Sequence, residues 1–274
     1  MRTNDPTINK AMALITLLSD FGSASGYPAA MKGVILSICP TAQIVDISHD
    51  VERHHIRAGA FVLWMVAPYF PENTVHCAVV DPGVGTARRA LAIASGGQFL
   101  VGPDNGLLIP AARRLGEPKI YAIENEKLFR KAVSRTFHGR DIFAPVAAHL
   151  AQGLPLTELG PPAPEYIKLS FGEGIRRGHL LEGEIIYIDS FGNVITNIAG
   201  HLLHELADPG TTLVVEVSRK SVSARCAHTY SDGEVSGLIV IVGSHGQVEI
   251  AANRESAAAR LRARPGEPVL IHRP

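Results

Sequence analysis

The stretch VHCAVVDPGVGTARR, at residues 75–89, decides the fold of the first half of the chain. Its first six residues are mostly apolar and partly β-branched, which is typical of a strand buried on both faces of a sheet. The runs at 14–18 and 44–47 have the same character. Apolar residues at helical spacing lie between these runs, at 28–38 and 56–67. This alternation predicts a mostly parallel sheet flanked by helices.

One pair of strands is expected to depart from the parallel pattern. Residues 90–94 and 99–101 are short apolar runs separated by Gly96 and Gly97. Two short strands joined by a tight glycine turn form an antiparallel hairpin. We therefore place a hairpin within the same domain as the parallel strands.

The chain changes character near residue 153, where the alternation of strands and helices ends. Prolines and glycines punctuate residues 153–178, and apolar periodicity is weak there. We predict an α/β domain over residues 12–165, a linker over residues 166–178 and a second domain over residues 179–274. Short strands joined by turns predict that the second domain is a small antiparallel β-barrel. The predicted strands are Glu184–Ile188, Val194–Ile198, Thr212–Val217, Leu238–Val242, Val248–Ala251 and Val269–Ile271.

Composition excludes several classes of protein. Of the 274 residues, 46% are hydrophobic and 19% are charged, which predicts a globular chain rather than a disordered one. The 26 basic and 26 acidic residues give a formal net charge of zero, which argues against a nucleic-acid partner. No apolar run approaches the roughly 20 residues of a membrane helix. Three scattered cysteines without a C-x-x-C pair argue against disulfides and structural zinc, and favour a reducing cytoplasm.

Acidic residues follow two of the predicted strands directly. Asp20 comes after the first strand and Asp81 after the third. Because the carboxyl ends of parallel strands line the ligand crevice of an open sheet, both carboxylates are expected on one rim. Taken singly, each is equally well explained as a helix cap or a turn residue. A dinucleotide loop is excluded because Arg88 stands where the third glycine belongs, and no G-x-x-x-x-G-K-[ST] motif occurs.

A second polar cluster, residues 136–141, precedes a predicted helix at 142–150. Exposed N–H groups at a helix start and a flexible glycine suit contact with a ligand. The alternative is a plain helix start with Asp141 as its cap. Among 12 histidines, His138 is distinguished by its neighbours, whereas the adjacent pair at 54–55 is interpreted as loop.

Taken together, six blocks in this order resemble the S-adenosylmethionine hydroxide adenosyltransferase family, whose relatives include the fluorinase and the chlorinase. The similarity runs from about residue 14 to residue 271. The blocks are Ser19-Asp20-Phe21-Gly22 with Met31-Lys32-Gly33, Val80-Asp81-Pro82-Gly83-Val84-Gly85, Pro103-Asp104-Asn105-Gly106, Phe137-His138-Gly139-Arg140-Asp141, Asp189-Ser190-Phe191-Gly192-Asn193, and Gly243-Ser244 with Glu249-Ile250-Ala251.

The resemblance implies an amino-terminal α/β domain, a carboxyl-terminal β-barrel and a homotrimer with active sites between subunits. The implied reaction cleaves S-adenosylmethionine with water into adenosine and methionine. Asp20 is implied to hold the ribose hydroxyls, Asp189 and Asn193 to contact the methionine part, and Phe137 and Ser244 to lie at the substrate. The implied water-handling residues are Asp81, Arg88 and His138.

The chemistry of this reaction is simple. The sulfonium leaves as a neutral thioether, so neither a general acid, a metal nor a further cofactor is required, and the enzyme must place a water in line with the 5′ carbon. His138 can accept the proton, while Arg88 can hold the oxygen and Asp81 can orient Arg88. The division of roles between Arg88 and His138 stays open at this point.

The sequence disfavours three rival functions. A halogenase of the same family is implied to carry an inserted loop before the Pro103 block and a tyrosine at position 81, and this chain has neither. A non-catalytic module that binds an adenosyl ligand is disfavoured by the complete set of Asp81, Arg88 and His138. A metallohydrolase is disfavoured because no H-E-x-x-H or closely spaced ligand set occurs.

Overall fold

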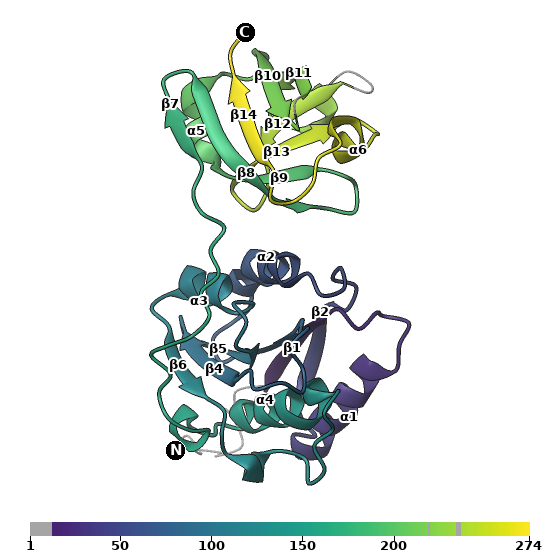
Figure 1. Cartoon of the computed structure of the whole chain (residues 1–274), viewed down its shortest axis with the longest axis vertical. Coiled ribbons are helices and arrows are strands. Elements are labelled where there is room, and N and C mark those ends of the chain that lie inside the picture. The colour runs from purple at the N-terminus through teal and green to yellow at the C-terminus, as the bar shows by residue number, and fades with distance from the viewer. Residues whose placement is uncertain (1–12, 219, 234–236) are drawn as a thin grey trace, which may run out of the picture. The chain divides into compact units, whose positions relative to one another are not determined.

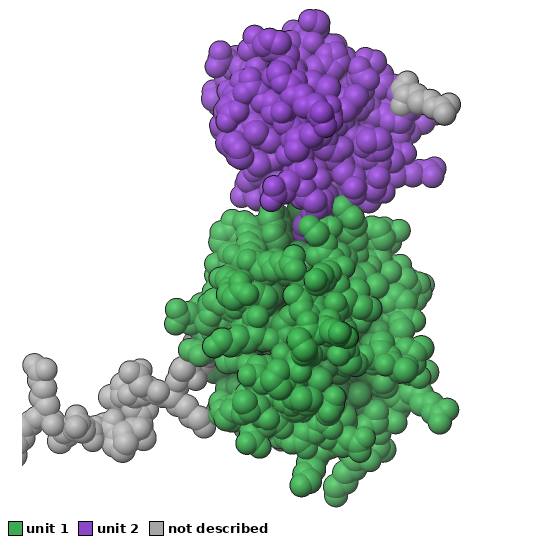
Figure 2. Space-filling model, turned by 60° about the vertical axis from the view of Figure 1, so that its left-hand side comes forward, with its two compact units in different colours: residues 1–170 green, residues 171–274 purple. Residues whose placement is uncertain are grey.

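The structure is a computed structural model that describes residues 13–218, 220–233 and 237–274. The chain forms two compact units, which Figure 2 shows in different colours. The first unit ends at Ser170 and the second begins at Phe171. This division falls within the stretch 166–178 that the sequence marks as a linker.

The first unit is built on a six-stranded sheet in the order β2-β1-β3-β5-β4-β6 (Figure 1). The β1–β2, β1–β3 and β3–β5 pairs are parallel, whereas β4 runs antiparallel to both β5 and β6. The predicted parallel sheet and hairpin are thus both present. The strands are β1 (Leu14–Ser19), β2 (Gln43–Ser48), β3 (Val75–Val79), β4 (Ala90–Ser95), β5 (Gln98–Pro103) and β6 (Lys119–Ala122).

Helices cover both faces of this sheet (Figure 1). Helix α1 (Tyr27–Ile38) packs with α4 (Ala144–Ala151), and α2 (Ile56–Val66) packs with α3 (Ile109–Leu115). A proline in the first turn begins α1, because its fixed φ suits a helix start and its missing N–H needs no partner there. Short helical turns complete the unit: Ala67–Tyr69, Glu126–Leu128, the π-helical turn Gly139–Phe143 that leads into α4, and Leu156–Glu158.

Burial separates the central strands from the edge strand. Strands β1 and β3 are almost wholly buried, as expected for strands covered on both faces. The third strand of the predicted trio, β2, lies at the sheet edge and is partly exposed, with Val45 41% accessible. The prediction of a strand here is confirmed, but the strand is not buried on both faces.

The second unit is a β-barrel closed by pairing of β14 with β8. Seven strand pairings close the barrel, and six of them are antiparallel. The seventh joins β11 and β12 in parallel, through Arg225–Ile239 and Cys226–Val240. Helices α5 (Gly200–Leu206) and α6 (Ala257–Leu261) and the turn Tyr230–Asp232 complete the unit. The strands are β7 (Ile175–Arg177), which pairs outside the barrel with β8, then β8 (Leu180–Ile188), β9 (Val194–Ala199), β10 (Thr212–Val217), β11 (Lys220–Cys226), β12 (Leu238–Val242), β13 (Gln247–Ala252) and β14 (Pro268–His272).

Candidate active site

A pocket lies in the first unit at the carboxyl edge of the parallel strands. Ser19 of β1 pairs in register with Val79 of β3, so the loops that follow both strands begin at the same edge. The cavity has a volume of about 210 Å³. It brings together four of the predicted site residues, namely Asp20, Asp81, Phe137 and His138.

Arg88 links two of these residues from behind the pocket. Its Nε donates to Asp81 Oδ1 at 3.1 Å and to Asp81 Oδ2 at 2.9 Å, and its Nη2 also donates to Oδ2. The same Nη2 lies 2.9 Å from His138 Nδ1. The side chains of Arg88 and Asp81 are only 10% and 4% exposed, so this charge-assisted pair is shielded from water.

The hydrogen bond from Arg88 fixes the tautomer of His138. A guanidinium can only donate, so Nδ1 of His138 accepts and carries no proton. Burial, followed by the positive charge of Arg88, lowers the pKa of His138. His138 is therefore a neutral imidazole whose proton resides on Nε2, and that nitrogen is a donor.

Hydrogen bonds from outside the pocket hold the loop that carries Asp81 and Arg88. Asn105 Nδ2 donates to the carbonyl of Val80 at 2.8 Å, and Arg89 Nη2 donates to Asp104 Oδ2 at 2.7 Å. These contacts give the Pro103-Asp104-Asn105-Gly106 block a structural purpose at the site.

Gly85 allows the same loop to approach the segment before His138. Its φ is +76°, and a Cβ at this position would lie 2.3 Å from the carbonyl oxygen of Arg135. Any other residue would push the Asp81–Arg88 loop away from the histidine. The glycine spacing that excludes a dinucleotide loop therefore serves close packing.

Asp141 is not a helix cap. Its carboxylate is fully buried and accepts hydrogen bonds from Arg140 at 2.7 and 2.9 Å, from Arg130 at 3.2 Å and from the backbone N–H of Ser134 at 2.8 Å. Burial alone raises the pKa of Asp141, and these hydrogen bonds outweigh it and lower the pKa. Asp141 thus organises the segment on which Phe137 and His138 lie.

Asp20 is tied to a loop that the sequence offers little reason to select. Its Oδ2 accepts a hydrogen bond from the backbone N–H of His54 at 2.9 Å, and both His54 and Arg53 line the pocket. His54 adopts a φ of +64°, which is uncommon outside glycine. Such backbone strain clusters at functional sites, but nothing in the sequence pattern signals it.

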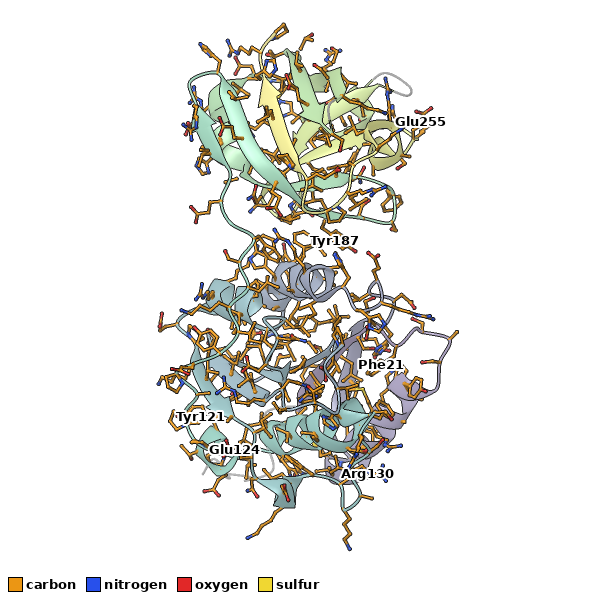
Figure 3. All side chains as sticks on the ribbon, viewed as in Figure 1. Phe21, Tyr121, Glu124, Arg130, Tyr187 and Glu255 are labelled. Carbon is orange, nitrogen blue, oxygen red and sulfur yellow. The ribbon has the colours of Figure 1, made fainter. Side chains whose placement is uncertain are left out.

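Aromatic rings form one wall of the pocket. Phe21, labelled in Figure 3, meets Phe137 edge-on with ring centroids 5.6 Å apart. Tyr27 contacts both rings, at centroid distances of 5.9 Å from Phe21 and 5.0 Å from Phe137. An aromatic wall beside a carboxylate suits a ligand that combines a flat apolar part with hydroxyl groups.

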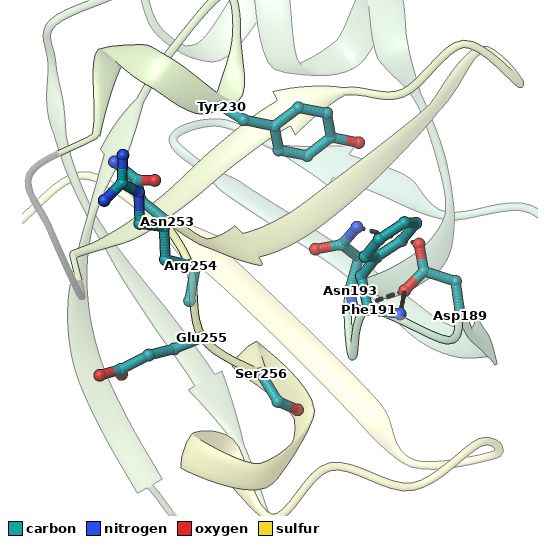
Figure 4. A pocket seen from close by; sticks show the side chains of 9 residues that line it. Asp189, Phe191, Asn193, Tyr230, Asn253, Arg254, Glu255 and Ser256 are labelled. Atoms are coloured by element: carbon teal, nitrogen blue, oxygen red, sulfur yellow. Dashed lines mark hydrogen bonds between the residues drawn. The ribbon is translucent and has the colours of Figure 1, made fainter.

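A second pocket, of about 630 Å³, lies in the β-barrel unit (Figure 4). Asp189 accepts hydrogen bonds from the backbone N–H groups of Phe191 and Asn193 and from Asn193 Nδ2, each at 2.9 Å. This turn presents Phe191 with its side chain exposed, at 79% accessibility. The carboxylate of Asp189 therefore shapes the turn, and the ring and amide side chains form the pocket wall.

Two features of the barrel pocket differ from the sequence-based interpretation. Ser244 is exposed in the turn between β12 and β13 and does not line this pocket. Tyr230 and Arg254 do line it, although no motif singled them out. The pocket joins segments from three separate turns, and single-chain spacing cannot show which turns of a barrel meet.

In the ranges 13–218, 220–233 and 237–274, no three His, Cys, Asp or Glu side chains are grouped so that they could hold a metal ion. Within the same ranges, no helix is both long and apolar enough to cross a membrane.

The molecule is thus an α/β unit with an Asp-Arg-His cluster at its sheet edge, joined to a β-barrel with an aromatic pocket. The chain belongs to the S-adenosylmethionine hydroxide adenosyltransferase family. The amino-terminal domain of that family matches residues 15–160, and the carboxyl-terminal domain matches residues 183–270. The resemblance inferred from the six sequence blocks is therefore confirmed.

Individual relatives agree with this assignment. An (R)-S-adenosyl-L-methionine hydrolase from Salinispora tropica is 43% identical over 257 residues, covering 92% of this chain and 95% of that protein. A fluorinase from an Actinoplanes species is 29% identical, covering 88% of this chain and 91% of that protein. The crystal structure of an uncharacterized conserved protein from Thermotoga maritima matches with a TM-score of 0.90 and 40% identity, covering 94% of this chain and all of that one.

Proposed function

We propose that this protein hydrolyses S-adenosylmethionine to adenosine and methionine. The observation that carries the proposal is the Asp81–Arg88–His138 cluster, which is buried beside a pocket that also contains Asp20. The family membership and the 43% identical relative that is named a hydrolase of this substrate support it.

The reaction balances without a further reactant. A water oxygen attacks the ribose 5′ carbon while the bond from that carbon to sulfur breaks, and its electron pair stays on sulfur. Methionine leaves as a neutral thioether, adenosine gains the hydroxyl, and one proton is released. A neutral leaving group needs no protonation, so placing and orienting the water is the main task of the site.

The tautomer of His138 revises its predicted role. Because Nε2 carries the proton, it can donate a hydrogen bond to the water oxygen but cannot accept a proton from it. Asp81 lines the pocket, and a carboxylate has four lone-pair directions, of which Arg88 occupies only part. We therefore assign the proton-accepting role to Asp81 and the water-orienting role to His138, with Arg88 fixing both.

Asp20 and Phe137 complete the proposed substrate contacts in the first unit. One oxygen of Asp20 accepts the His54 N–H, which aims the carboxylate and leaves acceptor capacity for ribose hydroxyls. Phe137 is 8% exposed and held by Phe21, so it offers a firm apolar wall.

The size of the first pocket supports a shared site. Its volume of about 210 Å³ falls below the roughly 300–1,000 Å³ common for pockets that enclose a small ligand. We propose that the barrel pocket with Asp189 and Asn193 holds the rest of the substrate, and that the protein is a homotrimer whose sites join the first unit of one subunit to the barrel of another. Ser244 keeps a proposed place near the substrate on the family resemblance alone.

We further propose that the enzyme works in the cytoplasm without a metal. Cys39, Cys77 and Cys226 are buried and unpaired, which supports a reducing compartment. Arg88 supplies a fixed positive charge where a metal ion would otherwise act.

A product assay tests the proposed function. Purified protein is incubated with S-adenosylmethionine in buffer containing a chelator, and adenosine and methionine are quantified by chromatography. Equal amounts of both products are expected, at the rate seen without chelator. Intact substrate after prolonged incubation would refute the hydrolase proposal, and restoration of lost activity by zinc would refute metal independence alone.

Subunit sharing has its own test. Arg88→Ala subunits carry an intact barrel half, whereas subunits with Phe191→Ala and Asn193→Ala carry an intact first-unit half. Both proteins are assayed at a substrate concentration at which each alone is strongly impaired. If sites form between subunits, co-expression of the two impaired proteins restores part of the activity. If each site lies within one chain, the mixture is no more active than the average of its components.

A further inference from the structure

Behind the barrel pocket lies a set of three hydrogen-bonded side chains, Tyr230, Glu249 and His245, which we call the Tyr–Glu–His chain. Tyr230 donates from its hydroxyl to Glu249 Oε1 at 2.8 Å. Glu249 Oε2 lies 3.2 Å from His245 Nε2, and the backbone N–H of Gln247 donates to His245 Nδ1 at 3.1 Å. The function proposed above uses none of these three side chains.

The hydrogen-bond donors determine which atoms of the Tyr–Glu–His chain carry protons. His245 Nδ1 accepts from a backbone N–H, so the ring proton resides on Nε2 and points at Glu249. Both oxygens of Glu249 then accept hydrogen bonds, which is the pattern of an ionised carboxylate. Its partners are two neutral groups, so its negative charge is not balanced by a lysine or arginine of the described residues.

The fold makes room for this buried charge. Glu249 and His245 are each only 4% exposed in their side chains. A Cβ at Gly243 would lie 2.5 Å from His245 Nε2 and 2.8 Å from Glu249 Oε2, so only glycine fits there. A buried carboxylate without a cationic partner costs free energy. A cationic ligand in the adjoining pocket would supply the missing charge and offset this cost.

The charge acts on one end of the barrel pocket. The Tyr230 ring lines the pocket, and its hydroxyl points toward the end formed by Asp189 and Asn193 (Figure 4). Burial, the hydrogen bond to Glu249 and the charges of Glu249 and Asp189 raise the pKa of Tyr230. Among the described residues, Asp189, like Glu249, accepts hydrogen bonds from neutral donors alone. Arg254 and Glu255 also line the pocket, but they lie on the side away from Asp189 and Asn193 (Figure 4). Glu249 and Asp189 therefore place negative potential at the Asp189 end of the pocket.

We propose that Glu249, aimed by His245 and connected to the pocket through Tyr230, makes the site selective for the cationic sulfonium form of the adenosyl ligand over neutral adenosyl thioethers. The inference rests on the proposed function, because it requires the cationic part of S-adenosylmethionine to reach the barrel pocket. It gives Glu249 the role of a specificity-determining residue that does not touch the reacting atoms. Loss of the sulfonium charge during reaction then weakens the hold on the products.

Glu249→Gln separates charge from shape. The amide oxygen can accept from His245 Nε2 while the amide nitrogen donates to the Tyr230 oxygen, so the hydrogen-bonded chain survives without its charge. We expect the affinity for S-adenosylmethionine, measured by calorimetry, to fall about tenfold, while the affinity for neutral adenosine stays unchanged. The matched control is Glu205→Gln on α5, which removes an exposed carboxylate paired with Arg176 of β7 and should change neither affinity.

Tyr230→Phe makes the opposite change. It keeps the charge of Glu249 but removes the Tyr230 hydroxyl, and with it the hydrogen bond that connects Glu249 to the pocket. We expect this variant to lower the affinities for S-adenosylmethionine and adenosine by a similar factor, smaller than tenfold. The preference for the cationic ligand should remain. If Glu249→Gln lowers the affinities for both ligands equally, the Tyr–Glu–His chain has only a structural role and the inference is overturned.

A measurement on the unmodified protein guards against a variant that fails to fold. The wild-type protein should bind S-adenosylmethionine more tightly than the thioether that lacks the sulfonium methyl group and its charge. High salt should reduce this difference in affinity, because it screens the charge interaction. Equal affinity would overturn the charge-selectivity inference while hydrolysis continues. Absence of both binding and hydrolysis of S-adenosylmethionine would instead refute the proposed function.

Discussion

The pocket of the α/β unit and the pocket of the barrel are organised by different means. In the first, buried charges hold one another, with Arg88 bonded to both Asp81 and His138. In the second, a turn and the exposed Phe191 ring form the wall, and Asp189 and Glu249 accept hydrogen bonds from neutral donors. In our proposal, the first pocket performs the chemistry, while the second binds the substrate and selects it by charge.

The largest expected effect is on the charged cluster. Arg88→Ala and His138→Ala should each lower kcat by about two to four powers of ten, the range for losing charge stabilisation or an oriented proton-transfer partner. Because His138 is proposed to orient the water and Arg88 to fix Asp81 and His138, KM should change little. Steady-state kinetics of the variants measure this split, and Arg113→Ala on α3 serves as a surface arginine control. A variant with near-normal kcat would remove that residue from the mechanism.

A smaller effect of the opposite kind is expected in the barrel. Asn193→Ala removes the amide that donates to Asp189 at 2.9 Å, so the turn that presents Phe191 loosens. Substrate affinity should fall roughly tenfold, as for loss of a hydrogen bond to a charged group, with kcat within about twofold of wild type. Calorimetric titration provides the affinity. An unchanged value would show that this turn is a plain hairpin.

The pH profile tests the neutral state of His138. Burial and Arg88 lower its pKa, so the imidazole stays neutral to a more acidic pH than a free histidine, whose pKa is about 6.5. We therefore expect kcat to remain level as pH falls through that value and to decline only through the lowered pKa, where protonation of Nδ1 breaks the bond to Arg88. Nitrogen NMR should show the proton on Nε2 at neutral pH. A kcat that rises on acidification would contradict this tautomer.

The smallest expected effect is that of chloride. A lone carboxylate about 4 Å from a chloride repels it by roughly 4 kcal/mol at an effective dielectric near 20. Since Arg88 pairs closely with Asp81, most of that repulsion is offset here. The preference for water then depends on its ability to donate a hydrogen bond to Asp81, which chloride lacks. Turnover in concentrated chloride should yield adenosine, and 5′-chloro-5′-deoxyadenosine as a major product would overturn the choice of nucleophile.

Sequence periodicity predicts the elements that are buried on a consistent face. Strands β1 and β3 and helices α1 and α2 follow from apolar runs, helical spacing and prolines. Strand β11 escapes prediction because its KSVSARC sequence alternates polar residues on an exposed face. Its neighbour β12 pairs with it in parallel, which depends on how the barrel closes and not on either sequence.

The candidate site is predicted to a similar extent. Asp20 and Asp81 follow from the rule that loops at the carboxyl edge of a parallel sheet meet, and the family resemblance implies Arg88 and His138. The tautomer of His138 depends on the direction of one hydrogen bond, which no spacing contains. His54 and Tyr230 were missed because they reach their pockets through a strained backbone and a barrel turn, both of which are set by tertiary packing.

The most direct test of the central claim, water attack on the ribose 5′ carbon, is turnover of S-adenosylmethionine in water enriched in heavy oxygen. Mass spectrometry of the products then locates the label. We predict one heavy oxygen in the 5′-hydroxyl of adenosine and none in methionine beyond that found in an enzyme-free control. Unlabelled adenosine, or 5′-methylthioadenosine as the nucleoside product, would contradict the account.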